Sequence, residues 1–176
     1  AMTVGNHEFD LTPAALTGAL NAVAPIEKGG TFPMTSANLD FTADACKAWQ
    51  PCALLPYWVK PGILKSVGGV PVGIFGLTIP TDPTMQPKPV VVQADVEARA
   101  AAVVASLQAQ KAEVIVFLSH LGGAGDRAVV SKVAGIDVVV QGHDHALYEA
   151  PVLLDGPEGR KVPAVSAGDH YLNVGR

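Results

Sequence analysis

One stretch of the chain, residues 137–145, limits the possible folds more than any other. It reads Asp-Val-Val-Val-Gln-Gly-His-Asp-His, an apolar and β-branched run followed by a glycine and two histidines. Such runs are typical of parallel strands that are covered on both faces, and Gly142 allows a sharp turn where the run ends. The stretch therefore predicts a buried strand that presents His143 and His145 at its carboxyl end, where open α/β sheets bind ligands.

The two histidines alone have two interpretations. Neutral imidazole is the commonest side-chain ligand of metals, so they could form a metal clamp, or they could be two solvated loop histidines. Two further segments favour the clamp. Residues 114–120 form a second apolar run that ends in His120, and residues 2–10 hold a short apolar segment followed by Gly-Asn-His-Glu. Four of the five histidines thus follow strand-like segments.

Composition excludes several classes of protein. A chain of 176 residues with 49% hydrophobic and 16% charged residues is expected to fold as one domain with a substantial core. The net charge of −4 at pH 7 and the absence of a basic stripe argue against a nucleic-acid partner. The apolar runs are far shorter than the roughly 20 residues that a membrane span requires.

Local patterns predict the elements of an α/β sandwich with its helices outside. The clearest are a helix at 11–24, with Thr12 as its N-cap and Pro13 in its first turn, and an alanine-rich helix at 95–110. Gly68-Gly69 indicates a hairpin between strands at 57–67 and 70–77. The remaining expectations are a strand at 32–38, a loop from there to 56, a proline-rich loop at 80–89, a glycine-rich loop at 122–125, a helix at 126–133, strands at 152–154 and 162–165, and a last strand starting at Val174.

Three motifs, in this order, resemble the later motifs of the calcineurin-like metallophosphoesterases. They are Gly5-Asn6-His7-Glu8, Ser119-His120 and Gly142-His143-Asp144-His145. Residues 5–10 (Gly-Asn-His-Glu-Phe-Asp), 36–40 (Ser-Ala-Asn-Leu-Asp) and 73–78 (Gly-Ile-Phe-Gly-Leu-Thr) are similar to the branch of 5′-nucleotidases, UDP-sugar hydrolases and cyclic-nucleotide phosphodiesterases. The resemblance covers nearly the whole chain.

This resemblance implies an αββα sandwich of two mixed sheets flanked by helices. The family opens with an Asp-x-His strand end and a Gly-Asp motif whose aspartate bridges two metals, and neither occurs before Gly5. Nothing after Arg176 could supply the separate domain that stacks the base in the larger nucleotidases. Residues 1–176 are therefore expected to be part of a catalytic domain truncated at its N-terminus, with its partner domain missing from this chain.

The resemblance also implies a set of metal ligands. Asn6, His120 and His143 would bind one divalent ion through an amide oxygen and two imidazoles, and His145 would bind a second. Such a mixed set suits Zn, Mn or Fe. Without the bridging aspartate, two cations would strongly repel each other, since unit charges at roughly 4 Å interact by about 4 kcal/mol at an effective dielectric of about 20. We expect two ions in the parent enzyme but at most one, weakly held, in this chain.

His7 and Asp10 are the implied catalytic pair. His7 would lie over the phosphate as a cation or as a proton donor to the leaving oxygen, and Asp10 would orient it and raise its pKa. An alternative role for Asp10 is to cap the helix that follows it.

Four further polar residues are assigned supporting or surface roles. Glu8 is expected to make hydrogen bonds around the site, Asn38 and Asp40 to tie a strand to a loop, and His170 to lie on the surface.

The expected function is metal-dependent hydrolysis of phosphate monoesters of nucleotides or related small phosphoesters. Two alternatives stay open: a thiosulfate-oxidation-type hydrolase of the same family, which acts on a sulfur ester carried by a protein, and a metal-binding or interaction fragment without catalysis. Asp10 favours the nucleotidase because it completes the His–Asp pair. The missing ligands favour the third interpretation for this chain taken alone.

Cys46 and Cys52, the only cysteines, lie in an irregular segment with two prolines. We expect them to form a small disulfide loop, in keeping with a periplasmic or extracellular protein. The alternative is a pair of free thiols.

Overall fold

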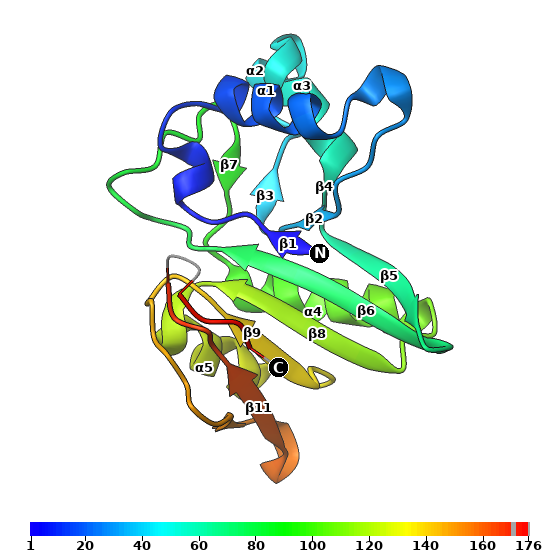
Figure 1. Ribbon diagram of the computed structural model, residues 1–176, viewed down its shortest axis with the longest axis vertical. Coiled ribbons are helices and arrows are strands. Elements are labelled where there is room, and N and C mark those ends of the chain that lie inside the picture. Colours follow the sequence, from blue (N-terminus) through cyan, green and yellow to red (C-terminus); the bar gives the residue numbers. More distant parts are fainter. Residues whose placement is uncertain (170–171, 176) are drawn as a thin grey trace.

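A six-stranded mixed sheet forms the centre of the protein (Figure 1). The computed structural model describes residues 1–169 and 172–175, so His170 lies outside the described residues. The strand order is β10-β11-β9-β8-β6-β5, in which the four inner strands are parallel and the two edge strands antiparallel. The strands are β5 (Gly62–Val67), β6 (Val70–Thr78), β8 (Val114–His120), β9 (Val138–Gln141), β10 (Val152–Asp155) and β11 (Lys161–Val165).

The predicted pairing of the two apolar runs is confirmed. Strands β8 and β9 are adjacent and parallel, with Val116 opposite Val138 and Ser119 opposite Gln141. Because parallel neighbours end at the same edge, His120 and the loop that carries His143 meet there. The helix α5 (Gly122–Lys132) makes the crossover between them, and such crossovers are right-handed in nearly all proteins.

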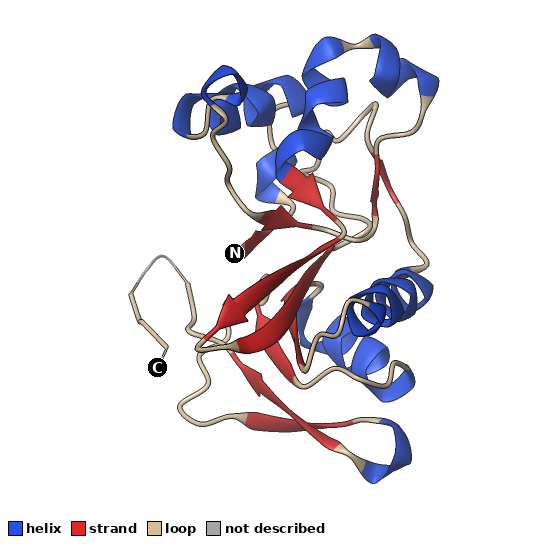
Figure 2. Cartoon of the chain, turned by 90° about the vertical axis from the view of Figure 1, so that its right-hand side faces the viewer, coloured by secondary structure: helices blue, strands red, loops and turns tan. Residues whose placement is uncertain are grey.

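Figure 2 shows two helices, α4 (Val96–Ala109) and α5, on one side of this sheet. Between them and the sheet lies a core in which Phe75 and Phe117 stack with ring centroids 4.8 Å apart. Helix α4 contributes the buried side chains of Val103 and Leu107 to the same core. This layer covers one face of β8 and β9.

A second layer contains the short strands and the N-terminal helices. The strands β1 (Met2–Thr3), β2 (Met34–Thr35) and β4 (Val59–Lys60) form a parallel sheet, and β3 (Leu39–Asp40) pairs with β7 (Val91–Val92). The helices of this layer are α1 (Pro13–Val23), α2 (Asp44–Ala48) and α3 (Gln50–Trp58), with the 3-10 turns η1 (His7–Phe9) and η2 (Ile26–Lys28). A further 3-10 turn, η3 (Pro157–Gly159), joins β10 to β11 in the central sheet. Buried Phe9, Met34 and Leu55 belong to the separate core of this layer.

Several predicted boundaries are confirmed by their local chemistry. Helix α1 begins at Pro13, and the Thr12 hydroxyl accepts a hydrogen bond from the Ala15 amide at 3.2 Å. The disulfide between Cys46 and Cys52 is also confirmed, with Cα atoms 5.1 Å apart.

Two of the expected loops are wrong. The segment expected to be a loop up to residue 56 contains α2 and most of α3. Both helices form because the disulfide and Leu55 are buried in the core of the N-terminal layer. Pro51 does not prevent this, since it lies in the first turn of α3, where its missing amide is tolerated. The glycine-rich stretch at 122–125 is the first turn of α5 rather than a loop.

Three expected strands are also corrected. Residues 57–67 do not form one strand: Trp58 ends α3, β4 joins another sheet, and β5 begins at Gly62. The strand predicted at 32–38 is limited to the two residues of β2, and Val174 is not in a strand.

Candidate active site

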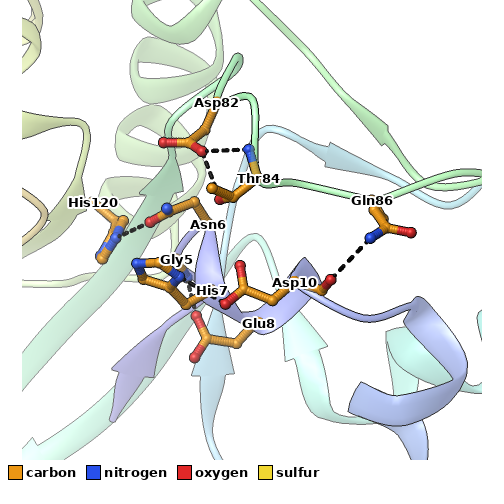
Figure 3. A network of polar contacts seen from close by, with 9 residues as sticks. All are labelled: Gly5, Asn6, His7, Glu8, Asp10, Asp82, Thr84, Gln86 and His120. Carbon is orange, nitrogen blue, oxygen red and sulfur yellow. Dashed lines mark hydrogen bonds and ion pairs between the residues drawn. The ribbon is translucent and has the colours of Figure 1, made fainter.

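The first contact of the site joins the turn after β1 to the end of β8. Asn6 is buried, and its Oδ1 lies 2.8 Å from Nε2 of His120 (Figure 3). The hydrogen bond requires the His120 tautomer that carries its proton on Nε2, so that the ring donates to the amide oxygen. Two residues of the predicted ligand set, far apart in sequence, are thus brought together.

Gly5 allows this contact to form. A Cβ atom at Gly5 would lie 2.7 Å from Cε1 and Nε2 of the His120 ring, closer than real side chains pack. The ring therefore lies directly against the backbone of the turn. The Gly-Asn-His-Glu motif needs its glycine for close approach to His120, not for turn geometry.

His143 enters from the loop after β9. Its ring lies edge-on to His120, with centroids 5.3 Å apart and planes at 64°. The Gly142 amide donates to the Ser119 carbonyl at 2.8 Å, which fixes the start of this loop to the end of β8. The expected convergence of His120 and His143 is confirmed.

His145 lies two residues further along the same loop. Its Nδ1 is 3.5 Å from Oδ2 of Asp169. Both His143 (φ 78°) and His145 (φ 56°) have left-handed backbone conformations, which are strained for residues other than glycine. The role of His145 as a metal ligand stays a prediction.

Burial and neighbouring charge keep His120 neutral. Burial of its ring, followed by the nearby His143 and His7, lowers the pKa of His120 to about 4. A neutral imidazole has a free lone pair for a metal. The environment thus holds His120 in its metal-binding form at neutral pH.

The predicted catalytic pair is in contact on η1. Nδ1 of the exposed His7 lies 2.8 Å from Oδ2 of Asp10. This hydrogen bond, reinforced by the charges of Asp10, Asp82 and Glu8 and opposed by slight burial, raises the pKa of His7. Thr12, not Asp10, is the N-cap of α1. The expected contact between His7 and Asp10 is confirmed, and their catalytic role stays a prediction.

Supporting hydrogen bonds hold the turn and the strand ends. The Gly5 amide donates to Oε2 of Glu8, as expected. Buried Asn38 donates to the carbonyls of Thr78 (2.7 Å) and Gln93 (3.1 Å) and accepts from the Thr78 amide (2.8 Å). Asp40 accepts from Nε2 of the same Gln93 at 3.1 Å. The predicted tie between strand and loop is therefore confirmed for both residues.

Asp82 was missed by sequence reasoning. Its Oδ1 accepts from the Thr84 amide (2.9 Å) and hydroxyl (2.6 Å), and these bonds, together with His143 and His7, lower the pKa of Asp82. The backbone amide of Gln86 donates to the Phe9 carbonyl at 2.7 Å, so the proline-rich loop is fastened to η1. The only available signal was the Asp-Pro-Thr spacing, which is typical of a side-chain-capped turn.

The donor atoms fit one divalent ion. Among the residues that the structure describes, no three His, Cys, Asp or Glu side chains converge as an ion would require. The amide oxygen of Asn6 completes the set with His120 and His143. A divalent ion would take the place of the Nε2 proton that His120 donates to Asn6 Oδ1 over 2.8 Å, so that both atoms could bind it.

The chain is similar to known proteins in sequence and in fold. No family model matches the chain. It is 34% identical over 182 residues to the 5′-nucleotidase of Homo sapiens, an alignment that covers 95% of this chain and 29% of that protein. The structure of a 5′-nucleotidase precursor from Thermus thermophilus superposes with a TM-score of 0.78 at 33% identity, covering 96% of this chain and 33% of that one.

The sulfate thiohydrolase SoxB of Thermus thermophilus superposes with a TM-score of 0.70 at 19% identity, covering 96% of this chain and 28% of that one, which shows a shared fold alone. The fold and the meeting of Asn6, His120 and His143 define a domain of the metallophosphoesterase class. The chain belongs to the calcineurin-like 5′-nucleotidase family. It spans about 29% of the length of the curated relatives that it matches.

Proposed function

We propose that the protein hydrolyses phosphate monoesters of nucleotides with the help of a divalent metal ion. One observation carries the proposal: Asn6, His120 and His143 come from three separate segments and meet at one edge of the sheet. Relatives of similar sequence are named 5′-nucleotidases, which supports nucleotides as the substrate class.

Asn6, His120 and His143 would hold the ion. When bound, a divalent ion would neutralise phosphate charge and activate a water molecule for attack. Zn, Mn and Fe all suit the donor set of one amide oxygen and two imidazoles. A second ion, with His145 as a ligand, is proposed for the complete enzyme.

His7 and Asp10 would handle the leaving group. Nδ1 of His7 faces Asp10, so Nε2 is the atom that can donate a hydrogen bond or a proton to the leaving oxygen. The Asp10 carboxylate orients the ring and stabilises the imidazolium. The Asp82 carboxylate, whose charge also raises the pKa of His7, favours the same protonated form.

An extracytoplasmic location is part of the proposal. The disulfide between Cys46 and Cys52 supports an oxidising compartment such as the periplasm or the extracellular space. Within the described residues, no helix is both long enough and apolar enough to cross a membrane.

A substrate panel tests the proposed activity. The complete gene product would be assayed with added Mn²⁺ on nucleoside 5′-monophosphates, a cyclic nucleotide, a UDP-sugar and an S-sulfonated peptide. We expect phosphate release from the monophosphates, which stops with EDTA and in His143→Ala. Sulfate release from the peptide alone would favour the thiosulfate-oxidation-type hydrolase, and inactivity on every substrate would favour a non-catalytic domain.

A further inference from the structure

Asp144 lies between two strained histidines. Both of its neighbours, His143 and His145, have positive φ angles, and such conformations persist only where the surroundings hold them. The loop therefore needs an anchor close to these two residues. The contacts of the Asp144 side chain provide one.

The Asp144 carboxylate binds the first turn of α5. Its Oδ2 accepts a hydrogen bond from the Gly123 amide at 2.6 Å, with the Gln141 side-chain amide at 3.4 Å. A carboxylate is favoured at this position because the unpaired amides of a helix N-terminus carry partial positive charge. The bond joins the loop after β9 to the helix that follows β8.

Gly122 makes room for this bond. It has a φ of 77°, and a Cβ atom there would lie 2.5 Å from Oδ1 of Asp144. Gln141 is held in turn, because the Tyr148 hydroxyl donates to its Oε1 at 2.9 Å. The carboxylate thus sits in a fitted position between the helix and the strand end.

We propose that Asp144 is a positioning residue for the metal site. By fastening the loop to α5, it holds the left-handed backbone of His143 and thereby aims that imidazole at the position shared with His120 and Asn6. The same anchor sets the direction of His145. This inference rests on the proposed metal-dependent function, but it concerns the order of the loop rather than the choice of substrate.

Two substitutions separate positioning from bulk stability. Asp144→Ala removes the acceptor for the Gly123 amide, whereas Asp144→Asn keeps an acceptor oxygen of the same size. The side chain is at an exposed position, so neither change opens a core cavity. Asp155→Ala, at an exposed carboxylate of β10, is the matched control.

The experiment measures the binding of Co²⁺ alone to the complete gene product. Binding is monitored through the visible absorption of Co²⁺, and the affinity is determined by competition with a chelator. Asp144→Ala should weaken Co²⁺ binding by about 10–100-fold, the usual effect of removing a group that orients a metal ligand. Asp144→Asn and Asp155→Ala should bind within a few-fold of the wild type. The thermal unfolding temperature of each variant should stay close to that of the wild type, although the metal affinity of Asp144→Ala falls.

If Asp144→Ala bound Co²⁺ with wild-type affinity, this inference would be overturned, but the proposed function would not. An Asp144→Asn variant as defective as Asp144→Ala would overturn the inference too, because the hydrogen bond to Gly123 would then not be the cause. A wild-type protein that binds no Co²⁺ would overturn the proposed function and this inference with it.

Discussion

Oδ1 of Asn6 lies 2.8 Å from Nε2 of His120, although 114 positions separate the two residues in the chain. The contact joins the N-terminal layer to the central sheet. Thr78, at the end of β6, strengthens the same junction by donating from its hydroxyl to the Val4 carbonyl at 2.7 Å. The site therefore depends on how the two layers pack, and changes at this junction should affect metal binding directly.

Gly5→Ala should damage the site through a clash. The new Cβ would lie 2.7 Å from the His120 ring, which must then move away from Asn6. We expect a loss of metal affinity and a destabilisation of about 1–3 kcal/mol, typical of overpacking, measured by metal titration and chemical denaturation.

Gly18→Ala is the matched control for this change. Gly18 lies inside α1, and a Cβ atom there would meet nothing within 4 Å. It should stabilise the protein by about 0.5–1 kcal/mol and leave metal binding unaltered. A Gly5→Ala protein with wild-type metal affinity would show that His120 does not need its observed position.

The His7–Asp10 pair predicts a pH effect on turnover. A general acid must be protonated, so activity falls as the pH rises through the pKa of His7. Since the hydrogen bond to Asp10 is the largest factor that raises this pKa, Asp10→Asn should move the basic limb of the kcat profile to lower pH. His7→Ala should lower kcat by about 10²–10⁴-fold with its metal content unchanged.

Asp44→Asn, at a fully exposed carboxylate of α2, should leave this profile unchanged. An Asp10→Asn enzyme with the wild-type pH profile would instead indicate that the pair has no part in proton transfer.

Asp126 predicts a pH effect on stability. This α5 residue is fully buried, and neither carboxyl oxygen has a hydrogen-bond partner in good geometry among the described residues. Burial, aided by the charge of Asp144 and partly offset by the Ser119 hydroxyl, raises the pKa of Asp126 from 3.8 to about 7. Between these values the native state binds a proton that the unfolded state has lost, so stability falls as pH rises.

Asp126→Asn should remove this dependence. The free energy of unfolding of the wild type, relative to the variant, should fall between pH 5 and 7 by up to about 1.4 kcal/mol per pH unit. Urea denaturation across this range measures the difference, with Asp155→Asn as the surface control. Parallel curves for the wild type and Asp126→Asn would mean that the buried carboxyl does not titrate in this range.

The strands and the histidines at their ends could be predicted because their signals are local. An apolar, β-branched run such as residues 114–118 forms a strand in almost any α/β context, and parallel neighbours must end at the same edge. The disulfide followed from two cysteines close in sequence, and α1 from Thr12 and Pro13. Each of these predictions needed only a few consecutive residues.

The remaining features depend on contacts that are distant in sequence. Helix α3 contains Pro56 in its interior, which weakens the local helix signal, and its buried face packs into a core formed from several segments. The glycine-rich first turn of α5 is held by Asp144, 21 positions away. Asp82 joins the site only because its loop is fastened to η1. No local pattern reports such contacts.

Metal analysis by mass spectrometry after dialysis tests the central claim most directly. Asn6, His120 and His143 are neutral ligands, and two cations without a bridging carboxylate repel each other, so residues 1–176 should retain at most one weakly held equivalent. His143→Ala should abolish this binding, and His7→Ala should leave it nearly intact. Two tightly bound equivalents in the wild type, or unchanged binding in His143→Ala, would contradict the site described for Asn6, His120 and His143.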